Sequence, residues 1–193
     1  FELFAAPPEK DLEWIDAGAE GCQRFLGRVY RFITRNLERA ADSANESTAA
    51  DRRVLRKMHQ TIRKVTDDFE TRWHFNTSIA AVMELVNELY AAENDLSAPV
   101  IASVSETLVL LLGPFAPYLA QELWEEMGRT GPVFRQQWPA CDEELAKEEG
   151  AEVVLQVNGK VRSRAVVPFS TPKEKLEEIA TSFPGGERSF ANQ

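Results

Sequence analysis

Cysteine and histidine are scarce in this sequence of 193 residues, which contains two of each. The cysteines, Cys22 and Cys141, lie far apart, and neither belongs to a C-x-x-C pair. A zinc site needs three or four nitrogen, sulfur or oxygen ligands, and a disulfide framework needs several spaced cysteines. We therefore predict two reduced thiols and no metal site.

Long apolar runs and catalytic loop motifs are missing as well. Leu108–Leu112 is far shorter than the roughly 18 apolar residues of a membrane-spanning helix. No glycine-rich phosphate loop and no nucleophile elbow occurs, so we expect no catalytic residue in this chain. The sequence starts at Phe1 without a signal segment, and we expect a fragment of a longer cytoplasmic protein.

Charge is abundant but unevenly distributed. The net charge is −9, which by itself argues against a nucleic-acid partner. Glu20–Arg72, however, contains twelve Lys and Arg against eight Asp and Glu, whereas Trp73–Gly150 contains three against thirteen. The distribution predicts that a polyanion would be steered to one face of the molecule.

The first two-thirds of the chain has the three- and four-residue apolar spacing of amphipathic helices. Five helices are predicted: Cys22–Leu37, Thr48 to about Phe69, about Asn76–Tyr90, Ser97–Leu112 and Pro117–Met127. The fourth is apolar almost all round at its end, which is typical of the central helix of a bundle. Gly113-Pro114 stops it, and Gly128 follows the fifth helix. The fold class is therefore mainly α.

After Gly150 the pattern changes to strand alternation. Val153, Leu155 and Val157 alternate with other residues, and Asn158-Gly159 is typical of a tight hairpin turn. A short helix is predicted after Thr171, but a hairpin and one helix are too few to close a sheet. We expect three parts: 1–16 as a leading tail, 17–149 as the bundle, and 150–193 as an incomplete α+β module with a disordered end.

Arginines repeat along the first predicted helix. Arg24, Arg28, Arg31 and Arg35, followed by Arg39, are expected on the side opposite the apolar stripe. A solvated helix face normally interleaves charges of both signs, and arginine presents a planar fork that suits phosphate. We predict phosphate-backbone contacts for Arg24, Arg28, Arg31 and Arg35; a merely solvated face is the alternative.

The second predicted strand also carries alternating cations. Lys160, Arg162 and Arg164 are expected on one face of the hairpin, where they would contact phosphate or ribose. Charge that protects an edge strand from aggregation is the alternative.

Two further features favour structural roles. His59 is expected to be a hydrogen-bond donor or a packing residue rather than a metal ligand. The acidic stretch Asp142–Glu149 is interpreted as a solvated linker, because nothing apolar surrounds its carboxylates.

Several motifs, taken in order, resemble the C-terminal part of bacterial-type leucyl-tRNA synthetases. They are Phe4–Trp14, Gly21 to Val29, His59 to Asp68, Phe75 to Glu84, Leu112 to Trp124, Trp138-Pro139 and Gln156–Arg162. The last motif resembles the C-terminal module characteristic of the leucine enzyme. Tyr118 departs from the histidine common in relatives, and Ser163 from a frequent glycine. After Ala180 the resemblance stops.

The resemblance implies a class I enzyme that activates leucine with ATP and Mg²⁺ and esterifies tRNA. The bundle would be its anticodon-binding domain, which binds leucine tRNA, and the catalytic domain of the same polypeptide would be its other partner. No cofactor is expected in this chain, no membrane partner is expected, and the protein is expected to be a cytoplasmic monomer. The corresponding domain of a valyl or isoleucyl enzyme, and a stand-alone helical interaction module, remain alternatives.

Overall fold

The computed structural model describes residues 1–7, 9–11, 14, 16–42, 47–147, 151–157, 160–167, 171–173 and 175–176. Side chains are described for all of these except Arg72 and most of the two strands, where only Val154 and Val167 are included. The chain divides into two compact units, Phe1–Ala146 and Lys147–Gln193. The sequence predicts the division after residue 149 and a separate leading tail over residues 1–16. The predicted disordered end lies outside the described residues.

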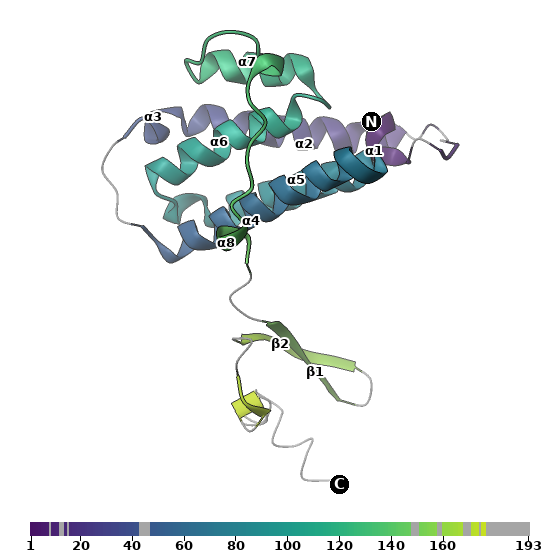
Figure 1. Cartoon of the computed structure of the whole chain (residues 1–193), viewed down its shortest axis with the longest axis vertical. Coiled ribbons are helices and arrows are strands. Elements are labelled where there is room, and N and C mark those ends of the chain that lie inside the picture. Colours follow the sequence, from purple (N-terminus) through teal and green to yellow (C-terminus); the bar gives the residue numbers. More distant parts are fainter. Residues whose placement is uncertain are drawn as a thin grey trace. The chain divides into compact units, whose positions relative to one another are not determined.

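The first unit is a helical bundle (Figure 1). Its long helices are α2, α4, α5, α6 and α7, which confirms the five that the sequence predicts. The helical elements are α1 (Glu2–Ala5), α2 (Asp16–Arg35), α3 (Leu37–Ala40), α4 (Ala49–Asp67), the π-helical turn η1 (Asp68–Arg72), α5 (Phe75–Ala92), η2 (Glu93–Asp95), α6 (Ala98–Leu112), α7 (Pro117–Glu126), η3 (Val133–Arg135) and α8 (Glu143–Ala146).

The core is built around α6. Ten of the fifteen residues of α6 are buried. Too few of its residues face solvent to form the polar side of a surface helix, so other helices must cover it. It starts with Pro99 in its first turn and ends at Gly113, as the sequence predicts. Side chains from α2, α4, α5 and α7 complete the same hydrophobic cluster. Figure 1 shows α4 and α5 lying side by side beneath α2 and α6.

A buried carboxylate ties the start of α4 to the start of α6. Thr48 and Asp51 form a capping box, in which each side chain accepts the other residue's backbone N–H. Asp51 also accepts the N–H of Ser97, at 2.9 Å. Burial raises the pKa of Asp51, but the hydrogen bonds from Ser97 and Thr48 outweigh it and hold that pKa below its usual value. Asp51 therefore remains ionised where α4 and α6 meet.

The connection between α4 and α5 is closed by a second buried carboxylate. Asp68 accepts hydrogen bonds from Lys64 at 2.5 Å, Thr77 at 2.6 Å and Ser78 at 3.1 Å. Its backbone carbonyl accepts the N–H of Trp73, at 2.7 Å. Trp73 has a φ of 53°, a left-handed conformation that is uncommon for a bulky residue. The Asp68 contacts hold the chain in this reversal.

The second unit contains an antiparallel hairpin of β1 (Ala151–Val157) and β2 (Lys160–Val167). This confirms the predicted pair of strands, although the turn at 158–159 lies outside the described residues. The pairing shifts between Leu155 and Gln156, so that Arg162 is an extra residue on β2 without a partner position on β1. Only Lys173 and residues 175–176 of the predicted helix after Thr171 are described as helical.

Candidate nucleic-acid interface

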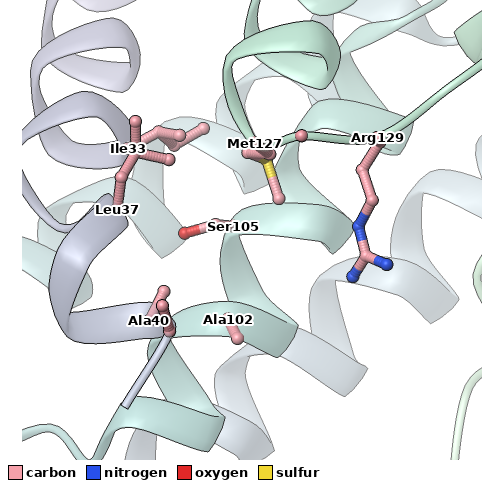
Figure 2. Close-up of a pocket in the computed structure, with 9 residues that line it drawn as sticks. Ile33, Leu37, Ala40, Ala102, Ser105, Met127 and Arg129 are labelled. Atoms are coloured by element: carbon pink, nitrogen blue, oxygen red, sulfur yellow. The ribbon is translucent and has the colours of Figure 1, made fainter.

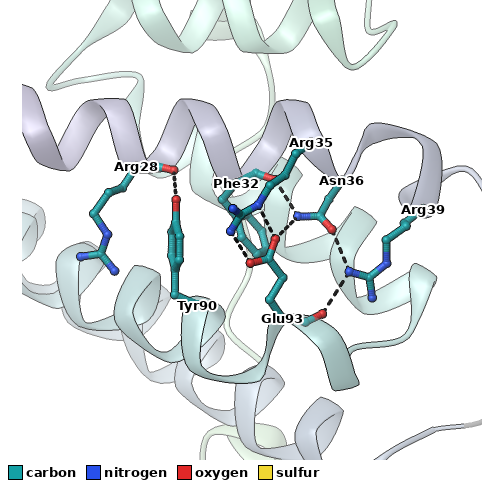
Figure 3. A network of polar contacts seen from close by, with 7 residues as sticks. All are labelled: Arg28, Phe32, Arg35, Asn36, Arg39, Tyr90 and Glu93. Atoms are coloured by element: carbon teal, nitrogen blue, oxygen red, sulfur yellow. Dashed lines mark hydrogen bonds and ion pairs between the residues drawn. The ribbon is translucent and has the colours of Figure 1, made fainter.

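The arginines of α2 are divided between two roles. Arg35 forms a two-pronged ion pair with Glu93, with one N–O distance of 2.6 Å. Arg28 donates to the side-chain oxygen of Asn87 at 2.7 Å, and its own carbonyl accepts the hydroxyl of Tyr90 at 3.0 Å. The guanidinium groups of Arg28 and Arg35 lie 4.6 and 4.9 Å from the centre of the Tyr90 ring. Figure 3 shows this network joining α2 to α5 and η2.

The network continues past the end of α2. The side-chain amide of Asn36 donates to the Phe32 carbonyl at 2.8 Å and to Glu93 at 2.7 Å. Arg39 donates to Asn36 and to the backbone carbonyls of Glu93 and Leu96. Glu93 is therefore the centre of a polar cluster that fixes α2 and α3 against η2 (Figure 3).

The prediction that all these arginines lie opposite the apolar stripe is wrong for Arg28 and Arg35. At 100° per residue they are only about 40° and 60° around the helix from the buried Phe32, whereas Arg31 is about 100° away. Because Arg28 and Arg35 lie beside the core, their side chains reach α5 and η2. There Arg35 forms an ion pair with Glu93, and both guanidinium groups lie against the Tyr90 ring.

Arg24 and Arg31 remain available to an external anion. They are seven residues apart on one side of α2, and both are exposed. Arg24 has a single pairing with Glu20 at 3.6 Å, in which both side chains are about 70% exposed, and such pairs are weak. Arg31 has no ion-pair or hydrogen-bond partner within the described part of the chain.

The cations of α4 are mostly paired with acidic residues of other helices. Arg53 pairs with Glu88, Lys57 with Glu84 at 2.6 Å, and Arg63 with Glu143 at 3.1 Å. Arg52 is exposed and has no such partner among the residues described. Glu84 and Glu88 are four residues apart on α5, as Arg53 and Lys57 are on α4. This matching spacing is a sequence signal for the pairing, and the prediction did not use it. We therefore define the exposed basic set as Arg24, Arg31 and Arg52.

The predicted cations of the hairpin lie on β2, but their side chains are not described. By register, Lys160 pairs with Val157 and Arg164 with Val154, while Arg162 is the extra residue of the bulge. The prediction that the three share one face assumes uninterrupted alternation. A bulge breaks that alternation, because two residues of one strand oppose one of the other.

The sequence predicts a donor or packing role for His59, and its Nδ1 atom accepts the Asp142 N–H at 3.1 Å, so this ring nitrogen is an acceptor. The acidic stretch differs from expectation. Residues 143–146 of the expected linker form α8, which packs on α4. Asp142 caps this helix by accepting the N–H groups of Glu144 and Leu145.

Both cysteines, Cys22 and Cys141, are free thiols.

Three exposed aromatic side chains were not predicted as interface residues from the sequence. Trp73 is 64% exposed, Tyr118 92% and Phe134 79%. Arg135 stacks over Phe134, at 5.9 Å from the ring centre. Exposed aromatic rings can stack on unpaired bases. However, Tyr118 and Phe134 belong to the acidic part of the sequence, which disfavours a polyanion there.

A pocket of about 210 Å³ lies where α3, α6 and the end of α7 meet. Figure 2 shows that its walls are mainly apolar, with side chains that include Leu37, Ala40 and Ala102. The polar side chains are Ser105 and Arg129, and Arg129 is paired with Glu106 at 2.5 Å. The lining offers no pair of groups for acid–base chemistry.

No metal cluster of three or more His, Cys, Asp or Glu side chains occurs in the described ranges. Within the same ranges, no helix combines the length and the apolar character needed to cross a membrane.

Comparison with known proteins gives consistent matches along the chain. Residues 51–178 match the family model described as the anticodon-binding domain of tRNA ligase. The leucine–tRNA ligase of Solibacter usitatus (strain Ellin6076) is 62% identical over 177 residues, which make up 92% of this chain and 21% of that protein. The leucine–tRNA ligase of Desulfotalea psychrophila is 45% identical over 189 residues, with 93% and 23% covered.

A solved structure matches as well. It is the ternary complex of Agrobacterium radiobacter K84 agnB2 LeuRS with tRNA and LeuAMS. The match has a TM-score of 0.75 at 32% identity and covers 98% of this chain and 25% of that one. The chain thus spans between a fifth and a quarter of the length of the relatives that it matches.

Proposed function

The chain belongs to the family of anticodon-binding domains of tRNA ligases, and we propose that it forms the tRNA-holding part of a leucine–tRNA ligase. The observation that carries this proposal is the 62% identity to a leucine–tRNA ligase along 92% of the chain. The similar solved structure supports it, since it is a complex of LeuRS with tRNA.

The whole enzyme would join leucine to tRNA in an ATP-dependent reaction, with Mg²⁺. This chain would contribute binding and positioning, which lower the barrier by holding the substrate in a reactive geometry. The sequence has no nucleophile elbow and no glycine-rich phosphate loop to supply catalytic groups. The catalytic domain of the same polypeptide would supply these groups, in a cytoplasmic monomer.

The proposed tRNA contacts are the exposed basic set, Arg24, Arg31 and Arg52, in the first unit and the strand cations Lys160, Arg162 and Arg164 in the second unit. The exposed basic set is supported by exposure and by the weakness or lack of internal pairing. Arg28 and Arg35 would act indirectly, by holding α2 in place through Glu93 and Tyr90.

The corresponding domain of a valyl or isoleucyl enzyme is the second candidate. The solved structure and the leucine–tRNA ligases of the comparison favour the leucine enzyme over it. A stand-alone interaction module without an RNA partner is disfavoured by the same matches.

The proposal is tested by titrating fluorescently labelled leucine tRNA with the purified chain at about 50 and about 200 mM salt. Phosphate contacts release counterions, so we expect binding at the lower salt and a loss of affinity of at least tenfold at the higher. A duplex DNA of equal phosphate number serves as the control and should bind more weakly. Absence of tRNA binding at the lower salt would contradict the proposal.

A further inference from the structure

The segment Trp138–Ala146 is fastened along α4 by side chains and backbone groups of that helix. Four residues of α4 take part: His59, Gln60, Arg63 and Thr66. The Trp138 indole N–H donates to Thr66 Oγ1 at 2.9 Å, and Arg63 pairs with Glu143 at 3.1 Å. The Gln60 amide donates to the Ala146 carbonyl at 3.0 Å. We call this set of contacts the α4 strap.

The strap runs antiparallel to α4. Gln60 contacts the far end of the segment, at Ala146, and Thr66 contacts its beginning, at Trp138. His59 adds two contacts in between, because its carbonyl accepts the Cys141 thiol at 3.3 Å and its Nδ1 accepts the Asp142 N–H. The segment is therefore attached at its start, its middle and its end.

The segment has little structure of its own to hold it in place. It contains one helix, α8, of four residues, which is far too short to be stable alone in water. Its order depends on α4 and on two anchors, buried Ala146 and partly buried Trp138. Ala146 is 2% exposed, and the Trp138 ring lies 5.9 Å from that of Phe69.

The strap determines how much chain separates the two units. With Ala146 fastened, the sequence has only residues 147–150 before β1 begins at Ala151. With the strap released as far as Trp138, the connection lengthens to residues 139–150, or three times as many. The effective concentration of one tethered binding unit near the other falls with about the −3/2 power of tether length, so this change lowers it about fivefold.

We propose that Gln60 and Arg63, through Ala146 and Glu143, are positioning residues that keep the connection between the two units short and so favour binding of both units to one tRNA molecule. This inference rests on the proposed function, because it assumes that both units contact tRNA. The proposal predicts that Glu143, although acidic, favours binding to the polyanionic tRNA.

The test is whether removal of the Glu143 carboxylate weakens or strengthens tRNA binding. In the full chain, Gln60→Ala combined with Glu143→Ala removes two strap contacts and also one negative charge. Electrostatics alone would make tRNA binding tighter. This variant leaves the contacts of Trp138, Cys141 and Asp142 in place, so the connection lengthens at most to residues 143–150. The strap therefore predicts weaker binding, by up to about threefold, with faster amide exchange at residues 143–146 and unchanged protection of α6.

A charge swap supplies the matched control. Arg63→Glu should speed amide exchange at residues 143–146, and adding Glu143→Arg should restore protection by re-forming the pair in reverse. Failure of the swap to restore protection, or unchanged or tighter tRNA binding by the Gln60→Ala, Glu143→Ala variant, would overturn this inference alone. Absence of tRNA binding by the unmodified chain would instead overturn the proposed function, and this inference with it.

Discussion

Asp68 illustrates how single residues determine this fold. It is 2% exposed, yet it is ionised and accepts hydrogen bonds from Lys64, Thr77 and Ser78. Burial raises its pKa, but these hydrogen bonds and the charge of Lys64 together lower that pKa below its ordinary value. Asp68 is a stabilising element at the reversal between α4 and α5.

Replacing Asp68 with Asn should therefore destabilise the first unit. The amide keeps the shape but loses the charge and part of the accepting capacity, and we expect a loss of about 2 kcal/mol in the free energy of unfolding. Urea denaturation followed by circular dichroism measures this loss. The neighbouring Asp67 is exposed, so Asp67→Asn is the matched control and should change stability little. Equal effects of the two substitutions would contradict the role given to Asp68.

His59 should make stability depend on pH. Burial lowers the pKa of His59, and the charge of Asp142 offsets this only in part. The unfolded chain therefore takes up a proton on His59 near pH 6.5, before the folded chain does. The contribution of neutral His59 is complete above that pH and declines as pH falls toward the lower folded pKa. Asp142, Arg63 and Glu143 are the charged groups around this contact.

The pH effect is measured as the change in Tm between about pH 7.5 and 5.5. His59→Asn keeps an acceptor for the Asp142 N–H but does not ionise, so Tm should fall less on acidification than in the unmodified chain. The same pH dependence in both proteins would rule out His59 as the titrating group.

At the scale of elements, α2 is held to α5 and η2 by the cluster around Glu93. We expect Arg35→Ala to lower Tm, because it leaves Glu93, which is only 15% exposed, without its main counter-charge. Arg31→Ala removes an exposed side chain of the same type on the same helix and should leave Tm within about 1 °C. Thermal unfolding by circular dichroism compares the two, and an equal Tm would contradict the division of the arginines into two roles.

Periodicity predicted the elements of this fold better than their contacts. The ends of α6 and the start of α4 followed from Gly113, Ser97 and Thr48, because caps and helix breakers act within a few residues. The short helix α8 and the π-helical turn η1 were not predictable in this way. Both depend on partners distant in sequence or on an unusual local backbone, which no short pattern encodes.

The sequence predicted that cations of α2 and β2 belong to the candidate interface, but not which arginines of α2 are paired internally or where β2 has a bulge. The arginine repeat pointed to α2, but the residues that are paired internally became known only from the position of Glu93, more than fifty residues away. In β2 the bulge at Arg162 interrupts the alternation from which a shared face was predicted. Long-range pairing and register are properties of the folded chain, so periodicity alone does not determine them.

At the scale of the whole molecule, the chain should bind but not catalyse. We expect no leucine-dependent exchange of pyrophosphate into ATP above a heat-inactivated control, since the sequence has no nucleotide-binding loop. Addition of the separately purified catalytic part of a relative serves as the positive control for the assay. Exchange by this chain alone would contradict its role as a binding portion.

The central claim is that exposed arginines of α2 bind the tRNA backbone. The most direct measurement is the slope of log affinity against log salt for leucine tRNA, compared between the unmodified chain and Arg24→Ala, Arg31→Ala. Each lost phosphate contact reduces the slope by about one, so the double variant should show a slope smaller by about two. Arg135→Ala, which removes an exposed cation from the acidic part of the chain, should leave the slope unchanged. An unchanged slope in the double variant would contradict the account.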